Sequence, residues 1–146
     1  LNIKDASSRF VRNEEMSSLL AIDDSAVVKI TKVTSQNLID LTMKEPGLHK
    51  ITGGRIVKIN SQKVPRVIGK QGSMINLIKN KTGCSITVGQ NGYVWIKGTP
   101  ENELVVAKAI KLIEEKSHQE GLTEKMDAFL SSEVKNAPAA KVEETQ

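Results

Sequence analysis

Apolar and polar residues alternate in two short runs within the first fifty residues. In residues 25–33, SAVVKITKV, the apolar Val28 and Ile30 share one side and polar neighbours take the other, which is typical of a half-buried strand. A second run, LIDLTM at residues 38–43, follows the turn residues Ser-Gln-Asn. The pattern predicts a β-hairpin. Because two strands alone are marginal in water, we expect this hairpin to need further strands.

From residue 55 onward the pattern changes to strands interrupted by helices. Apolar residues recur at helical spacing in SMINLIKNKT and over residues 104–113, whereas CSITV and YVWIKG alternate. Pro65 suits the first position of a short helix, and Thr99 before Pro100 suits the start of a longer one. Asn91-Gly92 predicts a type I′ turn. The expected order is strand, helix, helix, strand, strand, helix, at residues 55 onward, 65–68, 73–82, 84–88, 93–98 and 99–116.

Breaker residues and weaker patterns mark the remaining segments. The connection EPGLHKITGG, residues 45–54, predicts a domain boundary. Upstream, residues 12–20 predict a helical turn capped by Asn13. A short amphipathic helix is expected from Thr123, followed by a disordered tail, NAPAAKVEETQ.

The distribution of charge is more informative than the net charge of +4. Residues 46–100 contain no Asp or Glu but nine of the 21 basic residues, so the rest of the chain holds all 17 acidic ones. An acid-free basic stretch of this length indicates a polyanionic partner, with nucleic acid the first candidate. The alternative is that the acidic and basic residues are distributed this way by chance on an ordinary solvated surface.

Composition narrows the class of protein further. No run of eighteen apolar residues and no signal peptide is visible, so we expect no membrane association and a cytoplasmic location. The single cysteine, Cys84, rules out an internal disulfide framework. Because the sequence starts at Leu1 and not at Met, we expect it to be a fragment of a longer protein.

The segment VIGKQGSMI, residues 67–75, carries the most specific chemistry. Two helices that meet through Gly69-Lys70-Gln71-Gly72 leave unpaired N–H groups at the start of the second helix, which favours an anion. Glycines let a phosphodiester approach the backbone, while Lys70 and Gln71 project towards it. We therefore expect this loop to bind sugar-phosphate, with Arg66 and Lys79 as flanking phosphate contacts or solvated charges.

This segment and the order of elements resemble type I KH domains. The resemblance covers residue 55 to about residue 118, and it implies that Gly69 to Gly72 clamp single-stranded nucleotides whose bases lie on an apolar groove. Groove candidates are Ile68, either Ile75 or Ile78, and either Ile86 or Val88; for each of them the alternative is an ordinary core residue.

Over a longer span, GGRIVKINSQKVPRVIGKQGSMINLIKNKTGCSITVGQNGYVWIKG resembles the KH region of the RNA-binding cap subunits of archaeal exosomes. The preceding hairpin is similar to the closing strands of their S-one-type OB barrel. The resemblance implies an α+β protein with three parts: the end of an OB barrel at residues 1–50, a type I KH domain at 51–118, and a short helix with a flexible tail at 119–146. It also implies that Gly89-Gln90-Asn91-Gly92 is a structural hairpin packed near the barrel.

The resemblance implies a non-catalytic adaptor that captures single-stranded RNA for a ring-shaped 3′→5′ exoribonuclease, in several copies of a hetero-oligomeric complex. A standalone KH regulator of messenger RNA is the alternative, although it would lack barrel strands in front. A subunit of polynucleotide phosphorylase would have its KH domain before its barrel, so the order of the two domains argues against that enzyme. We expect no catalytic residues, no metal site and no cofactor, because His49, His118 and Cys84 lie on separate segments. Tyr93 and Trp95 are too few for an aromatic stacking sheet, and we expect Trp95 to pack against the barrel or a helix.

Overall fold

The computed structural model describes residues 1, 3–7 and 15–136, which fall into two compact units, Leu1–Thr52 and Gly53–Gln146. The division lies within the predicted breaker segment, residues 45–54. Asn13 and nearly all of the expected tail lie outside the described residues. No helix in the described ranges is long and apolar enough to cross a membrane.

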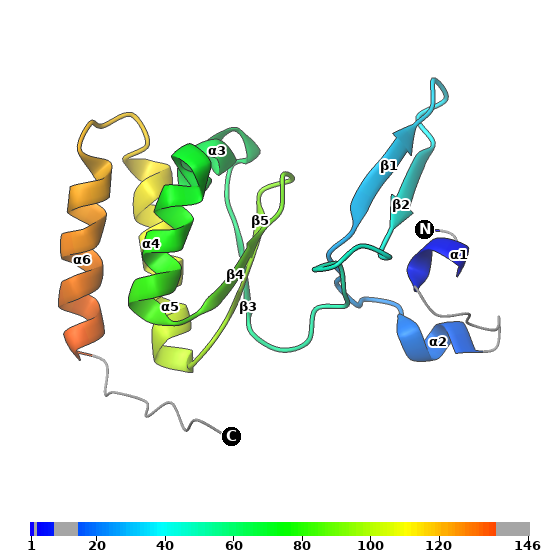
Figure 1. Cartoon of the computed structure of the whole chain (residues 1–146), viewed down its shortest axis with the longest axis horizontal. Helices are drawn as coiled ribbons and strands as arrows, with labels where there is room; N and C mark the ends of the chain where they lie inside the picture. Colours follow the sequence, from blue (N-terminus) through cyan, green and yellow to red (C-terminus); the bar gives the residue numbers. More distant parts are fainter. Residues whose placement is uncertain (2, 8–14, 137–146) are drawn as a thin grey trace. The chain divides into compact units, whose positions relative to one another are not determined.

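The first unit is built around the predicted hairpin, which the structure confirms (Figure 1). Strands β1 and β2 pair antiparallel, with a bulge between Ile30 and Lys32. The chain turns at Asn37, whose φ of 60° suits an asparagine. The elements of this unit are α1 (Ile3–Ala6), α2 (Met16–Leu19), β1 (Lys29–Val33) and β2 (Ile39–Thr42).

Large apolar side chains on this hairpin are more than half exposed, namely Ile30, Val33, Leu38 and Ile39. β-branched and aliphatic side chains favour strands because they pack against neighbouring surfaces, and these have little to pack against among the described residues. The exposure fits the expectation that further strands complete this sheet. The OB barrel to which the hairpin was assigned stays a prediction.

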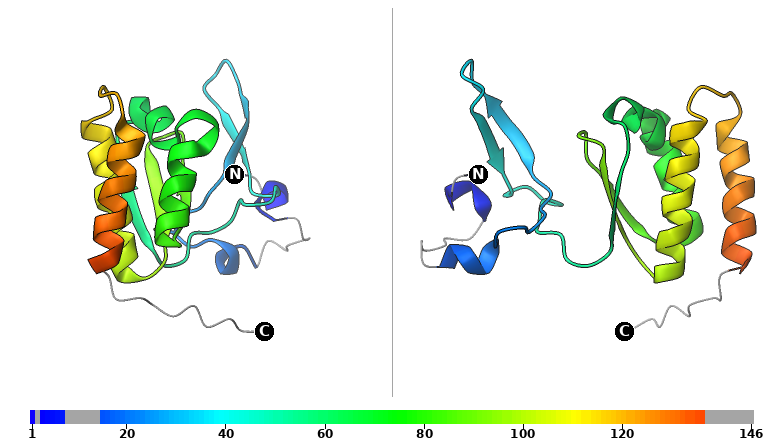
Figure 2. Two further views of the ribbon diagram at one scale, coloured as in Figure 1. Left: turned by 60° about the vertical axis from the view of Figure 1, so that its left-hand side comes forward. Right: turned by 180° about the vertical axis from the view of Figure 1, so that it is seen from behind.

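The second unit has a three-stranded antiparallel sheet covered on one face by helices (Figures 1 and 2). The strand order is β3-β5-β4, with Val57 and Val88 both opposite Val94. Side chains alternate across the sheet, so Val94 and Ile96 face the helices and are fully buried. The elements are β3 (Arg55–Lys58), α3 (Val64–Ile68), α4 (Ser73–Thr82), β4 (Ser85–Val88), β5 (Tyr93–Lys97), α5 (Pro100–Glu115) and α6 (Leu122–Asn136).

The predicted order of elements is confirmed, and short 3-10 turns precede and follow α3. Helix α5 begins as expected, because the Thr99 hydroxyl accepts a hydrogen bond from the Asn102 N–H and Pro100 occupies the first turn. Helix α4 ends at Gly83, which adopts the left-handed conformation expected of a helix C-cap.

Helix α6 is a larger part of the domain than the sequence indicated. It spans 15 residues and packs on α4 and α5, so it lies farthest from the sheet in Figures 1 and 2. Leu122, Met126 and Leu130 are at most 4% exposed and belong to the same core as the sheet residues. The expected short helix is therefore a full fourth helix of the core layer.

We expect Leu130→Ala to lower the free energy of unfolding by about 3 kcal/mol, because the fully buried side chain would leave a cavity between α6 and its neighbours. Urea unfolding of the whole chain measures this. Leu104→Ala is the matched control, since Leu104 on α5 is 48% exposed and its loss should cost about 1 kcal/mol or less. Equal effects of the two substitutions would show that α6 contributes little to the core.

The hairpin between β4 and β5 differs from the predicted type I′ turn. Asn91 does not have a positive φ, and the Gly92 N–H donates to the carbonyl of Gly89 over 3.1 Å. The turn is therefore of type I, followed by Gly92 with φ of 88° as a bulge residue. The cause is tertiary, because the carbonyl of Gly92 accepts a hydrogen bond from the Ile59 N–H.

Candidate nucleic-acid interface

The Gly-Lys-Gln-Gly loop connects the end of α3 directly to the start of α4. The Gly69 N–H donates to the carbonyl of Pro65 over 3.0 Å, which closes the short helix. A single 3-10 turn, Lys70–Gly72, then leads into α4 at Ser73. Two helices therefore meet end to end around four residues, as the sequence predicted.

Three of these four residues have a positive φ. Gly69 has φ of 75° and ψ of 175°, which lie outside the left-handed helical region and in one that only glycine readily adopts. Gln71 has φ of 54° and Gly72 has φ of 76°. A Cβ atom on Gly69 would lie 2.7 Å from the backbone nitrogen and the Cβ of Met74, so position 69 admits only glycine without rearrangement.

The loop presents hydrogen-bond donors and a lysine ammonium that a ligand can reach. Lys70 and Gln71 are exposed, and neither side chain has a hydrogen-bond or ion-pair partner within the described residues. Gly72 precedes α4 without a side-chain cap; the Ser73 N–H donates to the carbonyl of Lys70, and the N–H groups that follow it in the first turn lack a side-chain partner. A phosphate can approach N–H groups and a lysine ammonium together here.

The basic stretch is mostly unpaired in the structure. Of its nine basic residues only Lys50 and Lys81 form ion pairs among the described residues, with Asp24 and Asp127. The seven others keep their charge unneutralised, namely Arg55, Lys58, Lys63, Arg66, Lys70, Lys79 and Lys97. Three of them, Arg66, Lys70 and Lys79, lie on α3, the loop and α4, so the elements around the loop carry three cations without a carboxylate partner among the described residues.

The two predicted flanking cations are placed differently. Arg66 lies on α3 beside the loop, and its Nη2 donates to the carbonyl of Gln119 over 3.0 Å, which fixes the guanidinium but leaves most of its donors free. Lys79 is half-buried on α4, with no ion pair in the described part of the chain. A phosphate contact by either residue stays a prediction.

The apolar groove candidates are buried to different degrees. Ile78 is fully buried, so of the pair Ile75 and Ile78 only Ile75, 8% exposed, retains some surface. Ile86 is 4% exposed, whereas Ile68 and Val88 are half-buried and pack against the rim of the core. The surface for bases is therefore greatest at Ile68 and Val88, and contacts to Ile75 and Ile86 would reach only their edges.

The second glycine pair, Gly89 and Gly92, is fixed by packing. A Cβ on Gly92 would lie 2.3 Å from the carbonyl oxygen of Ile59. The Gly89 N–H donates to the carbonyl of Tyr93 over 2.8 Å, continuing the ladder between β4 and β5. These contacts support the expected structural role of this hairpin; its packing near a barrel stays a prediction.

Trp95 lies on the sheet face opposite the helices and is 6% exposed, so of its two expected partners a helix of this unit is excluded and the barrel stays a prediction. Its indole N–H donates to the carbonyl of Gly53 over 2.9 Å, and Gly54 passes so close that a Cβ there would lie 2.8 Å from the indole nitrogen. The connection before β3 therefore covers this ring, whereas Tyr93 on the same face is 46% exposed beneath the ammonium of Lys58.

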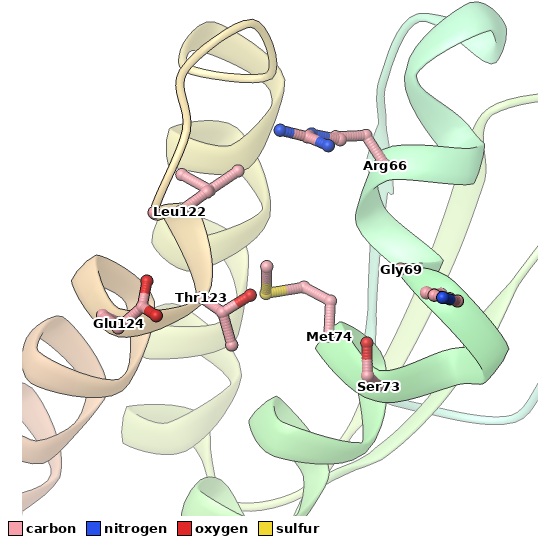
Figure 3. Close-up of a pocket in the computed structure, with 9 residues that line it drawn as sticks. Arg66, Gly69, Ser73, Met74, Leu122, Thr123 and Glu124 are labelled. Carbon is pink, nitrogen blue, oxygen red and sulfur yellow. The ribbon is translucent and has the colours of Figure 1, made fainter.

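A pocket of about 340 Å³ lies on the α6 side of the loop (Figure 3). It lies between the start of α4 and the start of α6, with the guanidinium of Arg66 and the thioether of Met74 on its walls. Its lining residues are Arg66, Gly69, Lys70, Ser73, Met74, Gly121, Leu122, Thr123 and Glu124. Sequence reasoning missed the α6 contribution because nothing in the pattern placed the start of this helix beside a loop fifty residues earlier.

Comparisons with known proteins agree on one family. The KH domain model matches residues 54–115. The exosome complex component Rrp4 of Methanosarcina acetivorans is 42% identical over 125 residues, covering 86% of this chain and 48% of the relative, and that of Methanothermobacter thermautotrophicus is 40% identical over 132 residues, covering 90% and 42%. A crystal structure described as "putative exosome complex RNA-binding protein" superposes with a TM-score of 0.77 at 33% identity, covering 88% of this chain and 74% of that one. The chain belongs to the exosome complex RNA-binding family.

As a member of this family, the chain has the expected α+β class and the KH domain, and both predictions are confirmed. The resemblance to archaeal exosome subunits is confirmed as well. The chain spans about half the length of the curated relatives it matches.

Cys84, one of the residues considered for catalysis, is buried. Burial raises the pKa of the Cys84 thiol, which disfavours the nucleophilic thiolate. No group of three or more His, Cys, Asp or Glu residues able to hold a metal ion occurs in the ranges described. Asp23 lies in a turn, and the carboxylate of Asp24 forms an ion pair with Lys50.

Proposed function

We propose that this member of the exosome RNA-binding family is a non-catalytic adaptor that binds single-stranded RNA and delivers it to a 3′→5′ exoribonuclease ring. Residues 69–72 clamp the sugar-phosphate backbone, and Arg66 and Lys79 add phosphate contacts. Ile68 and Val88 form most of the floor on which bases lie, and Ile75 and Ile86 contribute their edges. The adaptor needs no cofactor, works in the cytoplasm, and occurs in several copies within a complex with the ring.

The observation that carries this proposal is the geometry of the loop. Lys70 and Gln71 are exposed, and their side chains have no partner among the described residues. They lie beside the start of α4, which has no side-chain cap. Backbone N–H groups together with a cation favour phosphate, and the flanking Arg66 and Lys79 have no carboxylate partner among the described residues. Loosely specific binding follows, because the exposed aliphatic surface offers few base-reading groups.

The salt dependence of binding tests the adaptor proposal. If the loop and its neighbours neutralise three or four phosphates, log K for single-stranded RNA should fall with log[salt] at a slope of about −2 to −3, at −0.7 per phosphate. Fluorescence anisotropy with a labelled octaribonucleotide between 50 and 300 mM salt measures this slope. Absence of binding, or a slope near zero, would exclude this electrostatic clamp.

Two further measurements separate the adaptor from its alternatives. The purified chain should leave RNA intact with or without phosphate, and turnover would point to an enzyme. Co-purification with the nuclease ring subunits, tested with the whole-length protein, separates an exosome adaptor from a standalone KH regulator. The adaptor is favoured because the Rrp4 relatives match 86–90% of the chain, well beyond residues 54–115 of the KH match.

A further inference from the structure

The pocket beside the loop gathers polar groups from segments far apart in the sequence. Lys70 comes from the loop. Ser73 comes from the start of α4, and Thr123 and Glu124 from the first turn of α6 (Figure 3). None of these four side chains has a hydrogen-bond or ion-pair partner within the described residues, although other exposed side chains nearby do. Their donors and acceptors are therefore available to a ligand.

Arg66 is already oriented towards this pocket. Its guanidinium donates to the carbonyl of Gln119, whose side-chain oxygen accepts a hydrogen bond from Lys125 over 3.1 Å. The connection before α6 thus holds the guanidinium in place, so less side-chain entropy would be lost when a ligand binds to its remaining donors.

The mixture of charges limits the chemistry of the ligand. Arg66 and Lys70 favour an anion, but the carboxylate of Glu124 on the opposite wall repels a bare phosphate. A ligand that carries both a phosphate and a hydroxyl or amino donor satisfies both walls. The volume of about 340 Å³ lies at the lower end of the range for small-ligand pockets, which fits a single nucleotide.

We propose that this pocket holds one ribonucleotide of the RNA strand gripped by the loop, with its phosphate on Lys70 and Arg66 and its 2′-hydroxyl donating to Glu124. The proposal rests on the proposed function, because Gly69 and Lys70 belong both to the clamp and to the pocket wall. Glu124 accepts a hydrogen bond that DNA cannot donate, since deoxyribose lacks the 2′-hydroxyl. The pocket therefore gives the protein a preference for an RNA strand over a DNA strand.

Glu124 also lies in the first turn of α6, where any carboxylate is favourable. That structural role and the proposed one differ in a measurable way. If Glu124 served the helix alone, Glu124→Gln would remove a negative charge near the strand and raise affinity for RNA and DNA equally. If it accepts the 2′-hydroxyl, the same substitution reduces the ratio of RNA to DNA affinity.

The test compares labelled octa-adenylates of ribose and deoxyribose, measured by anisotropy with the full chain and its variants. We expect the wild type to favour the ribose strand, and Glu124→Gln to reduce the RNA-to-DNA affinity ratio about fivefold, the difference between a hydrogen bond to a carboxylate and one to a neutral amide oxygen. Glu120→Gln is the matched control, because Glu120 is exposed and does not line the pocket. That variant should keep the wild-type ratio.

A scan of single 2′-deoxy substitutions along the ribose strand locates the contact. At one position the 2′-deoxy substitution should weaken binding to the wild type, and it should weaken binding to Glu124→Gln less, because an amide oxygen accepts a weaker hydrogen bond than a carboxylate. An unchanged ratio in Glu124→Gln, or a ratio of one in the wild type, overturns the pocket assignment while RNA binding through the loop still stands. If adenosine monophosphate binds through Glu124 but the ratio is unchanged, the pocket takes free nucleotides and the strand assignment is wrong.

Discussion

Lys70→Asp combined with Gln71→Asp should weaken binding of single-stranded RNA by about ten- to a hundredfold at 0.1 M salt. The double variant removes one cation and places two carboxylates where the phosphate is expected, so attraction is replaced by repulsion. The slope of log K against log[salt] should become less steep by about 0.7. Both side chains are exposed, so the fold should be retained. Anisotropy titrations at several salt concentrations measure the affinity and the slope.

Lys32→Asp combined with Gln36→Asp is the matched control for net charge. It makes the same two changes at exposed positions on the hairpin of the first unit. If both double variants lost affinity equally, the effect would belong to the overall charge, and residues 69–72 would lose their assignment as the clamp. Circular dichroism of both variants checks that the fold is retained.

Gly69→Ala should destabilise the chain by about 3 to 5 kcal/mol. The cost has two sources: the backbone conformation at φ 75° and ψ 175° is almost restricted to glycine, and the new methyl group would lie 2.7 Å from the backbone of Met74. Met74 begins the buried face of α4, so relief of this contact would move core residues. Urea unfolding with linear extrapolation measures the change.

Gly83→Ala separates the cost of the close contact at position 69 from the cost of placing a side chain on a residue with positive φ. Gly83 also has a positive φ, but no atom lies within 4 Å of the position that its Cβ would occupy. Its substitution should therefore cost only about 1 kcal/mol. If Gly69→Ala lowers stability no more than this, the loop rearranges easily, and residues 69–72 do not form a rigid clamp.

The two glycine pairs of the domain serve different purposes despite their similar spacing. In Gly-Lys-Gln-Gly the central side chains are exposed and unpaired among the described residues, which leaves them for a ligand. In Gly-Gln-Asn-Gly the backbone itself is engaged, with Gly92 held against Ile59. Both loops have internal backbone hydrogen bonds, from Gly72 to Gly69 and from Gly92 to Gly89. Exposed, unpaired side chains fit binding, whereas a glycine packed against a distant strand end fits architecture.

Local sequence determined the elements of the KH domain and the position of the loop. Helix starts and stops at Thr99 and Gly83 depend on the chemistry of a few neighbouring residues, and alternation in β4 and β5 depends on which side is buried. Such signals act over a few positions, so they can be read without the fold. The KH family followed from the same short segment.

Only the tertiary structure decided the features that join distant segments. The turn before Tyr93 differs from the local Asn-Gly signal because Gly92 pairs with Ile59, more than thirty residues earlier. The length and burial of α6, and the pocket that its first turn shares with Lys70, depend on packing between helices fifty residues apart. Periodicity shows which face of a helix is apolar, but it does not show which surface that face will cover. The partner of each apolar face is set by the whole core, and so is the set of side chains that meet beside the loop.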